Sequence, residues 1–253
     1  MPGIGTLISG ILTDSLGWKG GFFIVLFYTL LVIFLCSFLP ETLKEKDKKA
    51  LKIKRIVQAY GRQFQNVRLV LWGTLMGLST AVIYMFSQEA PFVAIEKFGL
   101  TYAQYGLYYL IPSLGISFGL VLTAWLSDKV TSMTSMLWGI ITILIASLLM
   151  GVFFVGVWKN TWALFIPLVI ILIGDALLFT NASSMGVTDA EDKSNASAVM
   201  LFINSCIGFL GTFLIGVLAP GVLLAMPIAF LLVSVIMFSI WFYLHRKKQP
   251  HGS

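Results

Sequence analysis

The sequence is short of charge. Asp, Glu, Lys and Arg make up 11% of its 253 residues, against about 25% in a typical soluble domain, and 58% of the residues are hydrophobic. So few charged residues cannot cover a water-facing globule, which favours a chain surrounded by lipid. The formal net charge of +6 comes from short basic clusters between apolar runs, and this distribution favours contact with lipid headgroups over nucleic-acid binding.

Groups that catalyse reactions or bind metals are scarce as well. Cys36 and Cys206 both lie inside apolar runs, and His245 and His251 lie outside them. No nucleotide-binding loop, metal cluster or nucleophile paired with a base is apparent, and no basic region precedes the first apolar stretch, as it would in a cleavable signal peptide. The sequence predicts neither an enzyme nor a protein that carries a cofactor or a metal.

Long apolar runs are what the sequence has instead. A helix needs roughly 20 apolar residues to cross the hydrocarbon core of a bilayer. Seven stretches reach that length: Gly21–Leu39, Leu69–Ser87, Tyr105–Leu126, Thr134–Trp158, Trp162–Ala182, Ala196–Leu218 and Val222–Leu244. Tryptophans, which prefer the headgroup region, fall near several of these edges. The predicted fold is an all-α polytopic transmembrane bundle.

An eighth apolar stretch, Ile4–Thr13, is shorter and rich in glycine. At about 1.5 Å per residue it covers only half a bilayer. It resembles the second half of a helix whose beginning is missing, so the sequence predicts seven full spans preceded by a half helix.

The positions of lysine and arginine predict how the chain is oriented. If residues 40–68 are cytoplasmic, alternation of the spans places residues 127–133, 183–195 and the tail from His245 on the same side. These regions hold fourteen of the seventeen basic residues, and Lys19, Lys97 and Lys159 lie on the other side. The bias predicts a cytoplasmic C-terminus.

The segment Glu41–Asn66 is the one sizeable stretch between spans, and it is strongly basic. Ile53, Ile56, Val57 and Tyr60 recur in it at helical spacing, which fits an amphipathic helix at the membrane surface. Two interpretations stay open: a solvated linker that fixes orientation, and a specific site for a lipid or a regulator.

The first part of the chain resembles a transporter family in its motifs, which are Pro2-Gly-Ile-Gly5, Ser9-Gly10, Leu16-Gly17-Trp18-Lys19 with Phe22-Phe23, and Leu39-Pro40-Glu41-Thr42-Leu43. They resemble the fifth and sixth helices of drug–proton antiporters of the major facilitator superfamily, where a glycine- and proline-rich antiporter motif precedes Gly-Trp-Arg and an aromatic. Thr6 stands where that motif usually has a second glycine.

The resemblance continues through the rest of the chain, at Pro91-Phe92-Val93, Phe98-Gly99-Leu100, Gln104-Tyr105-Gly106, Ala124 to Lys129, Asn181-Ala182 and Asn195-Ala196-Ser197-Ala198. These segments are similar to helices seven to eleven of the bicyclomycin-resistance type. The family has twelve helices in two halves, so the resemblance implies that helices one to four are absent. The implied organisation is a remnant of the N-terminal half (1–40), a basic cytoplasmic linker (41–68), a complete six-helix half (69–244) and a cytoplasmic tail (245–253).

Asp175 is the most informative residue, because it is the single charged side chain inside the seven predicted spans. A carboxylate near the centre of a bilayer costs on the order of 3 kcal/mol. One hypothesis makes it a proton- or cation-coupling acid that faces a central cavity. The other makes it a protonated or hydrogen-bonded residue packed between helices.

Further candidates for the substrate pathway are polar or aromatic residues in or beside the spans. Asn181 and Asn204 either bind substrate or bridge helices through amide hydrogen bonds. Tyr84, Phe86 and Glu89 suit a cationic compound, through cation–π attraction and charge, or else form an aromatic belt with a solvated acid at the outer surface. Asp128 either latches the cytoplasmic gate or caps a helix.

The resemblance implies a secondary transporter, most closely one for proton-coupled multidrug efflux of small amphipathic compounds, in a bacterial inner (plasma) membrane. Its expected partners are the lipid bilayer, a small-molecule substrate and protons, and a missing N-terminal half or another chain. The alternative function is a non-transporting membrane remnant or scaffold derived from a truncated transporter gene. An intramembrane enzyme is disfavoured, because Asp175 has no partner base in the sequence pattern.

Overall fold

The computed structural model describes residues 2–39, 53–156, 160–190, 192–218 and 222–247. Its helices are α1 (Pro2–Leu16), α2 (Lys19–Cys36), α3 (Ile53–Gln65), α4 (Val67–Phe92), the π-helical turn η1 (Val93–Lys97), α5 (Tyr102–Leu126), α6 (Ser132–Val155), α7 (Trp162–Thr188), α8 (Lys193–Leu218) and α9 (Ala225–Lys247). Within the described residues no strand is present, and seven helices are long and apolar enough to span a membrane. The all-α fold with seven spans is therefore confirmed, and the chain is an integral membrane protein.

Two spans extend five or six residues beyond their predicted ends, into stretches that contain polar residues. The first half of the bundle begins with α4, which passes Ser87 and Pro91 before it widens into the π-helical turn η1. Helix α7 continues six residues past Ala182, and there the Thr188 hydroxyl donates to the carbonyl of Ser184.

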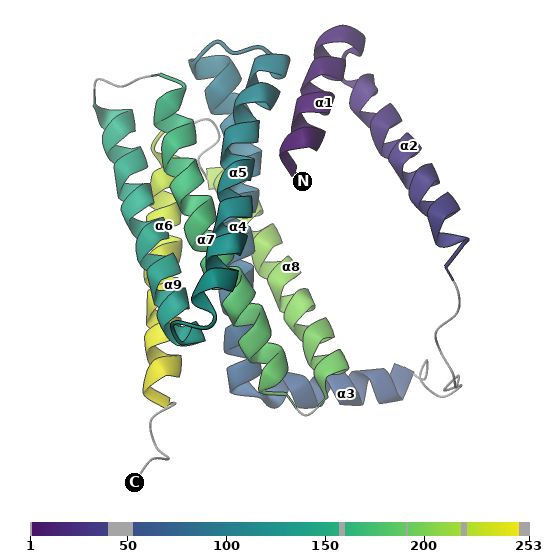
Figure 1. Ribbon diagram of the computed structural model, residues 1–253, viewed down its shortest axis with the longest axis vertical. Coiled ribbons are helices and arrows are strands. Elements are labelled where there is room, and N and C mark those ends of the chain that lie inside the picture. Colours follow the sequence, from purple (N-terminus) through teal and green to yellow (C-terminus); the bar gives the residue numbers. More distant parts are fainter. Residues whose placement is uncertain (1, 40–52, 157–159, 191, 219–221, 248–253) are drawn as a thin grey trace.

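Helices α4 to α9 form one bundle in which two sets of three helices exchange partners. Helix α4 packs on α8 and α9, while α7 packs on α5 and α6, so the first helix of each set lies against the second and third of the other. Helices α4 and α7 also contact each other (Figure 1). In an apolar stretch of 18 residues in each of them, 67% of the residues are buried. Two inverted three-helix repeats are expected to produce this exchange.

Glycines allow the closest of these contacts. A Cβ added to Gly77 would lie 2.7 Å from Ile207 on α8, and one added to Gly119 would lie 2.7 Å from Ala176 on α7. Gly139 on α6 and Gly174 on α7 meet backbone to backbone, since a Cβ on either would lie within 2.6 Å of the carbonyl oxygen of the other. The pairs Gly73 with Gly77 and Gly115 with Gly119 thus bring α4 close to α8 and α5 close to α7.

The remaining helices lie outside this bundle. Helix α1 packs along α5, α2 contacts α1, and α3 lies across the ends of α4 and α8 (Figure 1). The end of the molecule that holds α3 and the C-terminal end of α9 is called the α3 end below, and the opposite end is called the far end. The structure does not describe the basic residues from Lys44 to Lys52. Trp158, Lys159 and the tail after Lys247 also lie outside the described residues.

Candidate functional site: a polar layer in the middle of the bundle

Asp175 lies in the middle of the bundle. It is the central residue of the 27-residue α7, only 4% of it is exposed, and the Ser79 hydroxyl donates a hydrogen bond to its carboxyl oxygen Oδ1. Ser79 is fully buried and stands at the midpoint of α4. The contact therefore joins the two central helices at half their length, which places a carboxyl group near the centre of the bilayer.

A second hydrogen bond lies beside the first. Thr80 Oγ1 donates to Asn204 Oδ1 over 2.6 Å, and Asn204 stands near the middle of α8. Because Ser79 and Thr80 are consecutive on α4, their side chains point about 100° apart and reach two different helices. Ser79, Thr80, Asp175 and Asn204 together form what we call the mid-helix polar layer.

Asn181 bridges two helices outside this layer. Its Nδ2 donates to Ser135 Oγ on α6 over 3.1 Å and to the Leu177 carbonyl over 2.8 Å. Asn181 lies six residues beyond Asp175, roughly 9 Å along α7 toward the α3 end. These contacts correspond to the helix-bridging role among its two predicted roles.

Tyr84, Phe86 and Glu89 do not form one cluster. The Tyr84 side chain is 49% exposed on the α8 side of α4, where a Cβ added to Gly208 would lie 3.2 Å from its ring. Phe86 is buried and its ring centroid lies 5.9 Å from that of Tyr109 on α5. Glu89 is also buried, with 3% exposed, so the interpretation of a solvated surface acid is wrong.

Glu89 also changes the count of acids in the spans. The sequence prediction ended the span at Ser87, whereas α4 continues to Phe92 and carries Glu89 within it. Asp175 is therefore not the single charged side chain inside the spanning helices. The two acids lie far apart, because Glu89 is ten residues, or roughly 15 Å, along α4 from Ser79.

Asp128 follows the last turn of α5. The Ser127 hydroxyl lies 3.5 Å from its carboxylate. The N-cap of α6 is Thr131, whose side chain accepts a hydrogen bond from the Thr134 amide, so the expectation that Asp128 caps a helix is wrong. A role for Asp128 in a cytoplasmic gate stays a prediction.

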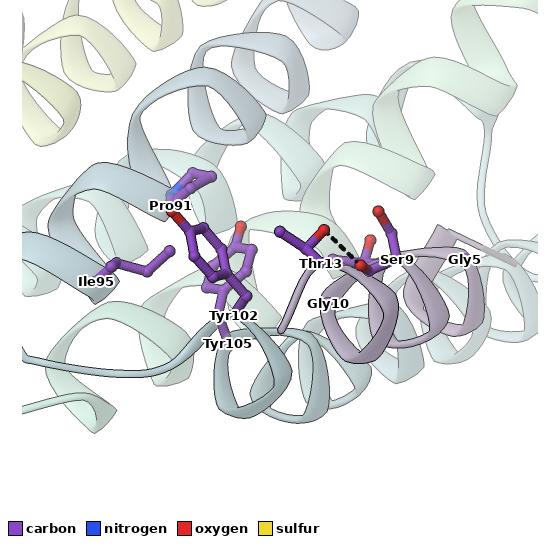
Figure 2. Close-up of a pocket in the computed structure, with 9 residues that line it drawn as sticks. Gly5, Ser9, Gly10, Thr13, Pro91, Ile95, Tyr102 and Tyr105 are labelled. Atoms are coloured by element: carbon purple, nitrogen blue, oxygen red, sulfur yellow. Dashed lines mark hydrogen bonds between the residues drawn. The ribbon is translucent and has the colours of Figure 1, made fainter. Parts of the chain in front are cut away.

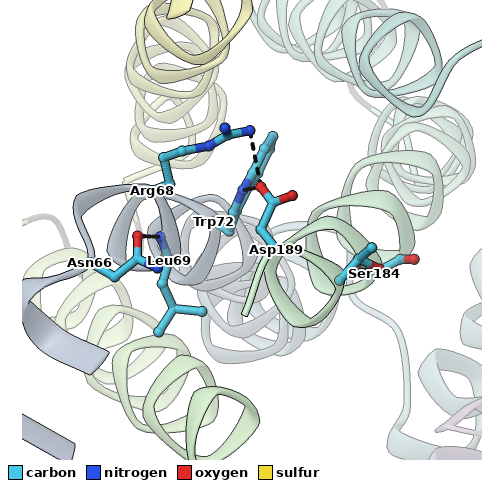
Figure 3. A network of polar contacts seen from close by, with 7 residues as sticks. Asn66, Arg68, Leu69, Trp72, Ser184 and Asp189 are labelled. Carbon is cyan, nitrogen blue, oxygen red and sulfur yellow. Dashed lines mark hydrogen bonds and ion pairs between the residues drawn. The ribbon is translucent and has the colours of Figure 1, made fainter. Parts of the chain in front are cut away.

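A polar cluster that the sequence did not reveal joins α4 and α7 at the α3 end. Arg68 pairs with Asp189 over 3.0 Å, and the buried Trp72 donates its indole N–H to the same carboxylate over 3.2 Å (Figure 3). Nearby, Asn66 caps α4 by accepting from the Leu69 amide. The cluster pins the two central helices together at this end.

Two cavities flank the bundle. One of about 480 Å³ lies between α1 and the far end of α4 and α5, and is lined by Gly5, Thr6, Ser9, Gly10, Thr13, Pro91, Ile95, Tyr102 and Tyr105 (Figure 2). The other, of about 590 Å³, is an apolar groove among α4, α8 and α9. The first cavity could have been anticipated from the helical spacing of the hydroxyl residues Thr6, Ser9 and Thr13, which puts them on one face of α1.

The chemistry of the site is that of hydroxyl, amide and carboxyl groups. Among the residues that the structure describes, no group of three or more His, Cys, Asp or Glu side chains is placed to hold a metal ion. The mid-helix polar layer can accept or release one proton at Asp175, and it can exchange hydrogen bonds with a bound molecule at Thr80 and Asn204.

Comparison with known proteins agrees with this architecture. The chain is 25% identical, over 267 aligned residues, to an uncharacterised transporter of Rickettsia bellii (strain RML369-C). The match covers 98% of this chain and 64% of the length of that relative. The family model of the Major Facilitator Superfamily matches residues 1–214, from α1 into α8. The chain belongs to the Major Facilitator Superfamily.

Proposed function

We propose that the chain is part of a secondary active transporter in which Asp175 couples the movement of a small amphipathic compound to that of protons. The observation that carries the proposal is the Asp175–Ser79 hydrogen bond between the midpoints of α7 and α4. An ionisable residue at this depth is costly to keep and usually marks an ion or substrate pathway. The single hydroxyl donor holds the carboxyl in place without neutralising it by an ion pair.

The class of substrate follows from the groups around the polar layer. Tyr84 lies one turn beyond Thr80 on α4 and is half exposed beside Gly208, so an aromatic face and a hydroxyl–amide pair share one side of the helix. An aromatic ring attracts apolar and cationic groups, and the amide and hydroxyl bind polar ones. This combination suits a compound that has both apolar or cationic groups and polar groups. The sequence motifs suggest that such a compound is exported by drug–proton antiport.

The orientation and partners belong to the same proposal. The basic residues near α3 support an orientation with the α3 end and the C-terminus in the cytoplasm of a bacterial cell, by the positive-inside rule. The chain spans 64% of its relative, and only 6% of the α2 span is buried. We propose that the working unit contains further helices, from a longer polypeptide or from another chain, which cover α2 and the exposed side of α8.

The experiment is transport in sealed vesicles that contain the full chain, with the fluorescent cation ethidium as the probe. A pH gradient is expected to drive ethidium movement, and Asp175→Asn is expected to abolish that coupled movement while exchange without a gradient persists. Glu96→Gln, which changes an exposed acid outside the polar layer, is the matched control.

A coupled rate in Asp175→Asn equal to that of the unmodified chain would refute the role of Asp175. If the chain alone gives no movement above empty vesicles, autonomous transport is rejected. The non-transporting scaffold then becomes the better description of this chain.

A further inference from the structure

The positive charge of the chain is concentrated in one segment. Residues 40–68 hold nine basic and three acidic side chains, whereas the remaining residues hold eight of each sign. The whole net charge of +6 therefore belongs to the segment that contains α3 and leads into α4. Transport does not explain this concentration, since the mid-helix polar layer lies far from it.

Helix α3 separates its apolar and polar positions onto two faces. Val57, Tyr60 and Phe64 recur at spacings of three and four and so share one face. Gln58 and Arg62 lie well away from that face at 100° per residue, as does the position of Arg55. The apolar face is not covered by the described helices, since 63% of Val57 and 44% of Phe64 are exposed.

The contact between Phe64 and α8 shows which way the apolar face points. The Phe64 ring meets the Phe202 ring edge-on, with their centroids 6.2 Å apart. Phe202 is nine residues into α8, roughly 14 Å along the helix from the α3 end. Because α3 lies across the ends of the spans (Figure 1), its apolar face is turned toward the membrane interior and its polar face toward water.

We infer that α3 and the basic residues around it form a docking surface for anionic phospholipids. The apolar face enters the boundary between headgroups and acyl chains, and the opposite face with the exposed Arg62 lies at the level of the lipid phosphates. The charge selects the occupant. A zwitterionic surface would satisfy the apolar face, but only an anionic surface also matches the five positive charges that the segment keeps when Arg68 is paired with Asp189. This inference does not depend on the transport proposal.

The test measures how deeply α3 sits in vesicles of two compositions. The full chain, with Cys36→Ser and Cys206→Ser, carries a nitroxide at Val57→Cys on the apolar face or at Gln58→Cys on the polar face. It is reconstituted in phosphatidylcholine alone or with phosphatidylglycerol. In anionic vesicles the Val57 label is expected to collide several-fold more with oxygen than with a water-soluble nickel complex, and the Gln58 label is expected to show the reverse.

Charge variants separate the anionic lipid from other occupants. Lys52→Gln, Lys54→Gln and Arg55→Gln together are expected to make the Val57 label in anionic vesicles behave as it does in phosphatidylcholine, where it is shallower. Lys193→Gln, Arg246→Gln and Lys247→Gln, three changes outside the segment, are expected to leave its depth unchanged. A Val57 label of equal depth in both vesicles would overturn the role of charge. A Val57 label in water in both vesicles would overturn the docking surface and leave the face to a protein partner.

Discussion

Helices α2 and α4 are both apolar spans, yet their surroundings are opposite. Helix α4 contacts α3, η1, α7, α8 and α9, and 67% of the residues in its apolar stretch of 18 residues are buried. Helix α2 contacts α1, and 6% of its span is buried. Lipid solvates apolar side chains as well as another helix does, so hydropathy alone cannot tell the two apart. The difference lies in small and polar residues, since α4 carries Gly73, Gly77, Ser79 and Thr80 at its contacts.

The largest expected effect comes from truncating a phenylalanine to alanine, once inside the bundle and once on α2. Phe230 on α9 is fully buried, whereas 69% of Phe27 on α2 is exposed. Phe230→Ala should lower the free energy of unfolding by about 3 kcal/mol because it leaves a cavity, and Phe27→Ala should change it by less than about 0.5 kcal/mol. Thermal unfolding in detergent measures both. Destabilisation by Phe27→Ala as large as that by Phe230→Ala would mean that another protein surface covers α2.

Adding volume should break the bundle at its tightest contact. Gly174→Val would drive a side chain into the Gly139 carbonyl and cost about 3 kcal/mol, which corresponds to roughly 6–12 °C in Tm. Gly5→Val on α1 is the control, since a Cβ there meets nothing within 4 Å. Size-exclusion chromatography after heating measures the difference. Equal behaviour of the two variants would contradict the backbone contact between α6 and α7.

A smaller effect is expected in the mid-helix polar layer. Ser79→Ala removes the hydroxyl that donates to Asp175 and leaves a buried carboxyl without that donor, which should cost about 1–3 kcal/mol. The same change should cost less in an Asp175→Ala background, because no carboxyl then requires the donor. A double-mutant cycle on unfolding temperatures measures the coupling. A coupling energy near zero would show that the pair does not hold α4 against α7.

The smallest effect is expected at the α3 end. The Arg68 and Asp189 side chains are 42% and 27% exposed, so Arg68→Met should cost less than about 1 kcal/mol and less still at high salt. Trp72 keeps its hydrogen bond to Asp189 in that variant. Unfolding at two salt concentrations, with Lys129→Met as the control, measures the difference. A loss larger than that of Ser79→Ala would make this cluster the main tie between the central helices.

The positions of the spans were predictable, because a bilayer demands a minimum length of apolar helix and the seven runs have it. The ends were less predictable. Nothing in the apolar pattern says that α7 continues past Ala182, since the extension contains hydroxyl residues such as Thr188, which bonds back to the Ser184 carbonyl. Ending the first bundle helix at Ser87 also hid Glu89, whose burial depends on the neighbouring helices.

The polar layer was half predictable. Asp175 and Asn204 stand out in any apolar run, whereas Ser79 and Thr80 do not, because most hydroxyls in membrane helices bond back to their own backbone. Thr123, Ser147 and Ser234 do so, each to the carbonyl four residues earlier. Which hydroxyl turns to another helix is decided by the packing, and here glycines on α4 bring α8 close enough for Thr80 to reach Asn204.

The exchange of partners between the two sets of helices has a consequence for biosynthesis. Ser79 and Asp175 are 96 residues apart, and Thr80 and Asn204 are 124 residues apart. At about 5–20 residues per second, the ribosome needs roughly 5–20 s to make the partner of Ser79 after Ser79 itself. During that time α4 is in the bilayer without the helix partners of its Ser79 and Thr80 hydroxyls. A chaperone or the insertion machinery that shields polar helices would act at this stage. Nascent chains that stop before α7 should therefore keep α4 bound to that machinery.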